Sequence, residues 1–174
     1  MPTFTQIGTA VVVGSGGQAA IEFTSIPNTY TDLVVKLSLR GASSLATMQI
    51  YMTFNNSTSG FSARQIYGDG SSATSATLSN SGAAISIINM NTNASTSNTF
   101  SSTDIYIPNY AGSINKSVSA DSSTENNAQG GALAGLTAGL WSNTAAITSI
   151  KFTNQDAVNF VQHSTAYLYG VSNA

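Results

Sequence analysis

The sequence predicts an all-β protein, an antiparallel two-sheet β-sandwich for which we favour a jelly-roll topology. Short runs rich in β-branched and aromatic residues recur along the chain, and Gly, Asn, Ser, Asp or Pro separates each run from the next, as turns separate strands. Helix signals are nearly absent, which favours antiparallel pairing with one face of each sheet buried. The length of 174 residues fits a single domain over residues 1–174.

Alternation of apolar and polar side chains identifies the strands of the first half. Leu or Val occupies every second position from 33 to 39, and polar residues stand at 36, 38 and 40, which is typical of a half-buried strand. The residues from Gln49 to Phe54 alternate in the same way. The strands expected in this half are Thr3–Val13, Ala19–Thr24, Leu33–Arg40, Gln49–Asn55 and Arg64–Tyr67.

The second half shows the same pattern, with Ile105 and Ile107 alternating with Asp104 and Tyr106. The segment 128–140 has Ala and Leu at helical spacing, but its four glycines each cost about 1 kcal/mol in a helix, so at most a short helical turn fits there. The strands expected in this half are Ala84–Asn89, Thr99–Ile107, Lys116–Ala120, Ala134–Trp141, Ile147–Thr153 and Thr165–Val171.

Three segments are expected to be loops, because they are rich in turn-forming residues and poor in large apolar ones. They are Asn56–Gly60, Gly68–Ser81 and Asn91–Asn98. Gly14–Gly17 is interpreted as a hairpin turn, since no Lys follows it as a phosphate-binding loop requires. Residues 1–13 are expected to be either the first strand or an arm that reaches a neighbouring subunit.

Charged residues are scarce. The chain has five Lys and Arg and seven Asp and Glu, or 7% of its residues, against about 25% in ordinary soluble domains. It has 27 Ser, 21 Thr and 16 Asn, so its surface is expected to be polar but nearly uncharged. Five basic residues and a net charge of −2 cannot neutralise a row of phosphates, so we expect no nucleic-acid binding. The absence of cysteine excludes disulfides, thiolate metal sites and thiol nucleophiles.

No segment is expected to direct the chain to a membrane or to span one. Residues 1–17 lack the basic region of a signal peptide, and the apolar run Ala10–Val13 is too short for its hydrophobic region. No stretch approaches the roughly 20 apolar residues of a membrane helix.

The sequence contains no recognisable catalytic motif, and we expect that the protein is not an enzyme. His163 is the only imidazole, no GxSxG elbow is present, and we interpret His163 as a surface or subunit-contact residue. Glycoside hydrolysis needs two carboxylates about 5 to 10 Å apart, and the pattern singles out no pair. Asp121 and Glu125 flank a Ser-Ser-Thr segment typical of a turn. The carboxylates are Glu22, Asp32, Asp69, Asp104, Asp121, Glu125 and Asp156.

Metal binding is also not expected. Asp69 stands between Gly68 and Gly70, where a carboxylate and loop carbonyls could hold a hard cation such as Ca²⁺. A Gly-Asp-Gly segment is more typical of a plain turn, and the spacing of a helix–loop–helix calcium site is absent. We therefore expect no metal site and no cofactor.

Aromatic side chains are the remaining candidates for ligand binding. They could stack on sugar rings if several were exposed on one face, although strand aromatics commonly fill a core or an interface. Tyr167 and Tyr169 share one face of the last expected strand and Leu168 lies on the other, so one of these sets points outward or toward a neighbour. The candidates for contact with a glycan are Trp141, Tyr106, Tyr110 and the loop Gly68–Ser81.

Five phrases of the sequence carry a family resemblance: IEFTSIPNTYTDLVVKLSLRG (Ile21–Gly41), FNNSTSGFSARQIYGDG (Phe54–Gly70), DIYIPNYAGSINKSVSADSSTENN (Asp104–Asn127), AGLWSNTAAITSIKFTN (Ala138–Asn154) and YLYGV (Tyr167–Val171). They resemble structural proteins of tailed-bacteriophage virions, which are common in phages of cyanobacteria. The similarity extends from about Ile7 to Val171 and rests on strand and turn phrases. It supplies no site residues.

The resemblance implies a head-decoration, or cement, protein. Such a subunit, expected as a homo-oligomer and specifically a trimer, attaches to the major capsid protein on the outer surface of the virion head and stabilises the shell. Scarce charge fits this role, because crowded like copies with many charges would repel one another. The alternative is a tail fibre, spike or baseplate subunit with a surface that binds a host glycan.

Overall fold

The computed structural model describes residues 1–78, 82–127 and 131–172. These residues form fourteen strands and no helix. The strands are β1 (Thr3–Gln6), β2 (Val11–Val12), β3 (Ile21–Phe23), β4 (Asp32–Ser38), β5 (Arg40–Gly41), β6 (Thr47–Phe54), β7 (Phe61–Gly68), β8 (Ala73–Leu78), β9 (Ile85–Thr92), β10 (Ser102–Ile107), β11 (Lys116–Ser123), β12 (Ala134–Trp141), β13 (Ile150–Asn154) and β14 (Thr165–Ser172).

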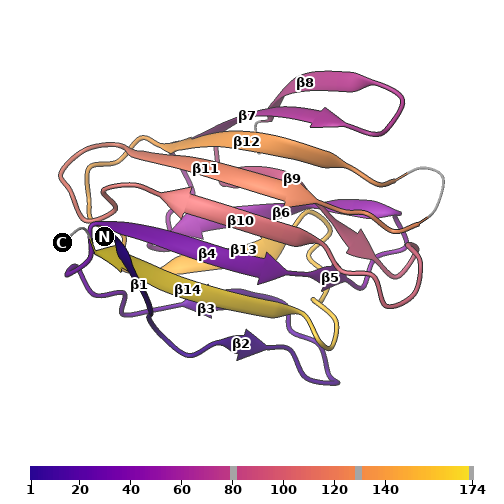
Figure 1. Ribbon diagram of the computed structural model, residues 1–174, viewed down its shortest axis with the longest axis horizontal. Coiled ribbons are helices and arrows are strands. Elements are labelled where there is room, and N and C mark those ends of the chain that lie inside the picture. The colour runs from indigo at the N-terminus through magenta and orange to yellow at the C-terminus, as the bar shows by residue number, and fades with distance from the viewer. Residues whose placement is uncertain (79–81, 128–130, 173–174) are drawn as a thin grey trace.

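The described strands make two sheets (Figure 1). The nine-stranded sheet has the order β1-β14-β4-β10-β11-β12-β7-β8, and β2 also pairs with β14. The five-stranded sheet has the order β3-β13-β6-β9-β5. The predicted all-β, two-sheet architecture is confirmed, whereas the jelly-roll topology stays a prediction. Pairing among the described strands is antiparallel with one exception, because the short strand β5 runs parallel to β9.

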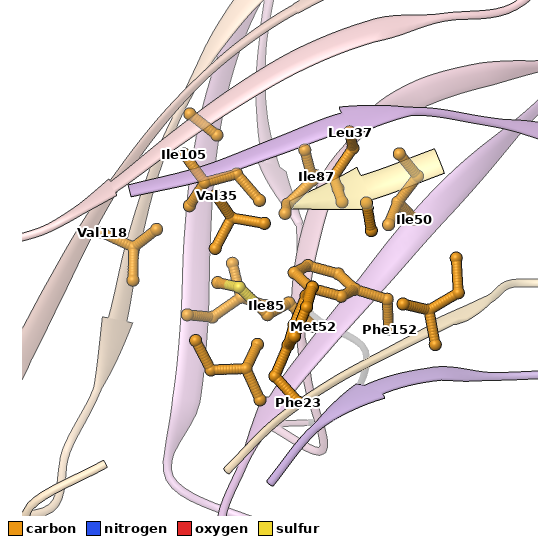
Figure 2. Close-up of a cluster of buried hydrophobic side chains, with 14 of the residues drawn as sticks. Phe23, Val35, Leu37, Ile50, Met52, Ile85, Ile87, Ile105, Val118 and Phe152 are labelled. Atoms are coloured by element: carbon orange, nitrogen blue, oxygen red, sulfur yellow. The ribbon is translucent and has the colours of Figure 1, made fainter. Parts of the chain in front are cut away.

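The space between the sheets is filled by alternate side chains of each strand. Figure 2 shows this core, to which the nine-stranded sheet contributes Val35, Leu37, Ile105 and Val118. From the five-stranded sheet come Phe23, Ile50, Met52, Ile85, Ile87 and Phe152. Burying each such side chain stabilises the fold by about 1.5–3 kcal/mol. The leucine and valine alternation predicted from position 33 onward is therefore the inward face of β4.

Two glycines of β12 bring the sheets close together. Thr137 and Trp141 point inward with Gly135 and Gly139, while Leu136 and Leu140 point outward. A Cβ atom on Gly135 would lie 2.6 Å from the Cδ1 atom of Ile88 in β9. The glycines that disfavour a helix in this segment thus allow β12 to pack closely against β9.

The N-terminal strand is shorter than predicted. Gly8 has a positive φ of 73°, which ends β1, and the chain resumes pairing only at β2. Both short strands pair with β14 of the same chain. The single strand expected over Thr3–Val13 is therefore wrong, because the left-handed backbone at Gly8 interrupts the ladder.

The loop predicted over Gly68–Ser81 is also wrong in its central part. Six residues of this segment, Ala73–Leu78, pair antiparallel with β7 as strand β8. The described part of the segment has no large apolar side chain to signal a strand before Leu78, but hairpin pairing with β7 supplies the backbone hydrogen bonds. Residues 79–81 lie outside the described residues.

A buried arginine of β5, Arg40, forms hydrogen bonds with the connection between β9 and β10. The Arg40 guanidinium donates hydrogen bonds to the carbonyl oxygens of Thr99 at 2.8 Å, Thr96 at 2.9 Å and Ser95 at 3.2 Å. Burial lowers the pKa of Arg40. Because backbone carbonyls satisfy the cation, this link needs no carboxylate.

We expect Arg40→Met to reduce the free energy of unfolding by about 2–3 kcal/mol, since it removes charge-assisted hydrogen bonds and leaves buried carbonyls without a donor. Arg64→Met is the matched control, because the Arg64 side chain is exposed and should cost less than about 0.5 kcal/mol. Urea denaturation measures both. Equal effects of the two substitutions would contradict the proposed role of Arg40.

Candidate functional site

The described strands leave the outward side of the nine-stranded sheet uncovered, and we call it the outer face. It consists of the alternate residues of β4, β7, β8, β10, β11, β12 and β14 that point away from the core. Three of its large apolar side chains are well exposed, namely Ile66 at 57%, Leu136 at 48% and Tyr106 at 43%. Leu140 is exposed as well. The outer face thus combines apolar side chains with small polar ones.

A shallow groove of about 520 Å³ runs over β7, β8 and β12 on the outer face. Leu136 stands opposite Ile66, and Ile66 stands opposite Ser75, so these three side chains form one row across three strands. A second hollow of about 490 Å³ adjoins the groove and shares the same row. Arg64, Ala138 and Thr77 also line the groove, so an arginine and hydroxyl groups lie beside its apolar side chains.

Tyrosines occupy the other part of the outer face. Tyr106 of β10 faces Val34 of β4, which in turn faces Tyr169 of β14. The Tyr106 hydroxyl donates to the Asp32 carboxylate at 2.8 Å, and this hydrogen bond raises the pKa of Tyr106. Tyr167 and Tyr169 are half-buried and Leu168 is buried, so the tyrosines form the outward set of the last strand.

The exposed charges on the strands of this face balance one another. Lys36 forms an ion pair with Asp104, and Arg64 and Asp121 complete the set among the described residues. Asp104 and Asp121 stand directly opposite each other on β10 and β11, a juxtaposition that the sequence pattern did not reveal. Like charges so placed repel, and Lys36 offsets this repulsion. Neither aspartate lines the two hollows over β7, β8 and β12 on the outer face.

The other candidate catalytic residues are dispersed. His163 is exposed in the turn before β14, with a positive φ of 73°, and no described carboxylate forms an ion pair with its imidazole. Other carboxylates satisfy nearby groups: Asp156 accepts a hydrogen bond from Ser43, and Glu125 accepts from the backbone of Asn126 and Asn127. Within the described ranges, no group of three or more His, Asp or Glu side chains could hold a metal ion.

Asp69 organises the turn between β7 and β8. Its carboxylate accepts hydrogen bonds from the backbone N–H groups of Ser72 at 2.7 Å and Ser71 at 2.9 Å. These bonds favour the ionised form and lower the pKa of Asp69 to about 2. The carboxylate that could have been a calcium ligand therefore serves as an acceptor within its own turn.

We expect the Asp69 carboxyl to titrate with a midpoint near 2, measured by carboxyl ¹³C NMR. Because this pKa lies below the value of about 3.9 in an unfolded chain, the ionised group stabilises the turn fully above that value. The contribution is lost as the pH falls from about 4 through about 2, and amide exchange at Ser71 and Ser72 should accelerate over that range. Asp69→Asn should abolish this pH dependence of amide exchange. A titration midpoint near 4 for the wild-type Asp69 carboxyl would contradict its role as an acceptor in the turn.

Two of the residues expected to contact a glycan belong to the core instead. Trp141 is 2% exposed and Tyr110 is fully buried. The Trp141 ring lies 5.6 Å from the Phe54 ring and 5.9 Å from the Phe61 ring, between centroids. The expectation that Trp141 and Tyr110 contact a glycan is therefore wrong, because the inward alternation of β12 and the turn after β10 place both rings between the sheets.

Trp141→Ala should destabilise the fold by about 3–5 kcal/mol, because it leaves a cavity beside Phe54 and Phe61. Tyr106→Ala, on the exposed outer face, should cost far less and keep the fold intact. Thermal unfolding followed by near-ultraviolet circular dichroism compares the two variants. A Trp141→Ala variant as stable as the wild type would contradict the core assignment.

Comparison with protein-family models, with curated proteins and with solved structures finds no match to this chain. No helix among the described residues is long and apolar enough to cross a membrane. The fold and its surfaces define a class, a two-sheet β-sandwich with an outer face that carries few charges.

Proposed function

We propose that this chain is a non-enzymatic structural protein of a tailed-bacteriophage virion, and that it decorates the outer surface of the head as a cement protein. The sequence resemblance to virion proteins supports the assignment to virion structural proteins. The observation that carries the docking role is the outer face, where Ile66, Leu136 and Leu140 are exposed among small polar side chains. Exposed apolar side chains gathered on one face are typical of protein contact surfaces.

The charge distribution supports assembly in many copies. The exposed charges on the strands of the outer face are two cations and two carboxylates, and the Asp32 carboxylate beside Tyr106 adds one buried negative charge, so this face carries little net charge. Like copies crowded on a shell then do not repel one another, and contacts made by apolar and hydroxyl groups depend little on salt. A strongly charged surface would make the same crowding unfavourable.

The proposed mechanism is linkage between binding and shell stability. The described chain exposes 8118 Å², so an interface of ordinary size, about 800 Å² per partner, needs only about a tenth of that surface. Binding across adjacent copies of the major capsid protein stabilises the assembled shell relative to separated subunits. The trimer expected from the resemblance is proposed for subunits attached to the shell, and neither nucleic acid nor membrane has a role in this proposal.

Leu136→Glu tests the docking role of the outer face. The charge replaces one of the exposed apolar side chains of the row without disturbing the core, so the folded variant should lose attachment to purified heads in a co-sedimentation assay. Ser15→Glu is the matched control, because Ser15 is exposed in the turn before β3 and carries the same new charge. Unchanged attachment of folded Leu136→Glu would contradict docking through this face.

Cryo-electron microscopy of intact particles tests the location directly. We expect density for this sandwich on the head surface in many copies. Density confined to the tail would overturn the decoration role and favour the second candidate, a tail fibre or baseplate subunit that binds a host glycan. The outward-facing Tyr106, Tyr167 and Tyr169 favour that candidate, and Tyr106→Ala should then weaken glycan binding.

A further inference from the structure

Strand β8 ends the nine-stranded sheet with an open edge. One side of β8 pairs with β7, and no described strand pairs with its other side (Figure 1). Ala73, Thr74, Ser75 and Thr77 are exposed, and Ala76 is half-buried. Because both faces of this strand reach solvent, β8 receives little stabilisation from the core.

The edge carries none of the usual devices that prevent strand pairing. Residues 73–78 include no charged residue, no proline and no glycine. The pairing with β7 continues over six successive residues without a bulge. Natural proteins protect an exposed edge with charges, proline or bulges, so an edge without them is a template for another strand.

The turn geometry shows which backbone groups point to the open side. Asp69 donates its N–H to the carbonyl oxygen of Ser72 at 3.3 Å, so these two residues form a hydrogen-bonded pair of the ladder. Such pairs alternate along an antiparallel ladder, which directs Thr74 and Ala76 toward β7. The N–H and C=O groups of Ala73, Ser75 and Thr77 therefore point away from the sheet.

We propose that β8 pairs with β8 of a second copy of this chain, antiparallel about a two-fold axis at Ser75. In this register Ser75 faces Ser75 of the second copy, and Ala73 faces Thr77 in both directions. In each of these three pairs, the N–H and C=O groups at the open edge of one β8 face those of the other copy. Each pair makes two backbone hydrogen bonds, six in all. A shift of two residues would lose one of the three pairs.

The observations favour a second copy as the occupant, because β8 is complementary to itself. The facing side chains in this register are Ser with Ser and Ala with Thr, which are small and uncharged, so nothing repels at the axis. An isologous contact needs the same patch on both partners, and β8 supplies it. The two-fold contact is separate from the proposed attachment to a capsid and does not depend on it.

Sedimentation equilibrium of the purified chain over a concentration series tests the pairing. Wild type should dimerise, and the amides of Ser75 and Thr77 should exchange more slowly as the concentration rises. Ser75→Lys and Ser75→Glu each place like charges opposite each other at the axis and should shift the protein to monomer. An equimolar mixture of the two variants should recover the dimer, because Lys then faces Glu.

Ser119→Lys is the matched control, since Ser119 is exposed on β11, away from the edge, and should leave the dimer unchanged. Three results would each overturn the pairing. They are a wild type that stays monomeric up to about 1 mM, a dimer or trimer that Ser75→Lys does not weaken, and a mixture of the two variants that stays monomeric. None of these results bears on attachment to heads, which the Leu136→Glu variant tests separately.

Discussion

The close approach of β9 to β12 is the contact on which the rest of the sandwich depends. A Cβ atom on Gly139 would lie 2.8 Å from the Cγ2 atom of Ile85, so any side chain there would push the two sheets apart. Interiors are packed as tightly as crystals, and a wider gap would leave voids beside Val118 and Met52 as well. The glycines of β12 thus allow large side chains of both sheets to meet in one core (Figure 2).

This packing also explains what is left at the surface. The core takes up Trp141, Tyr110 and most of the phenylalanines, so the aromatic rings left for ligands are chiefly tyrosines. Tyr106 and its tyrosine neighbours on β14 lie on the same face as the apolar row of β7 and β12. One face of the larger sheet therefore combines tyrosine and exposed aliphatic side chains with few charges.

Alternation was a reliable guide where the inward and outward positions of a strand differ strongly in polarity. For this reason it located β4, β6 and β10 within a few residues. It missed β8, whose faces both reach solvent and whose Ser, Thr and Ala residues resemble those of a loop. It also extended the first strand through Gly8, where only the backbone dihedral angle shows the break.

The candidate site, like the strands, could be predicted from the sequence only in part. Composition alone determined that the surface is neutral and polar and that the chain lacks thiol chemistry, since these properties depend only on which residues are present. Only the tertiary structure decided that Trp141 is a core residue, that Asp104 faces Asp121 and that Ile66 and Leu136 share a row. Such facts depend on strand register and order, which join residues far apart in the chain and leave no mark on local periodicity.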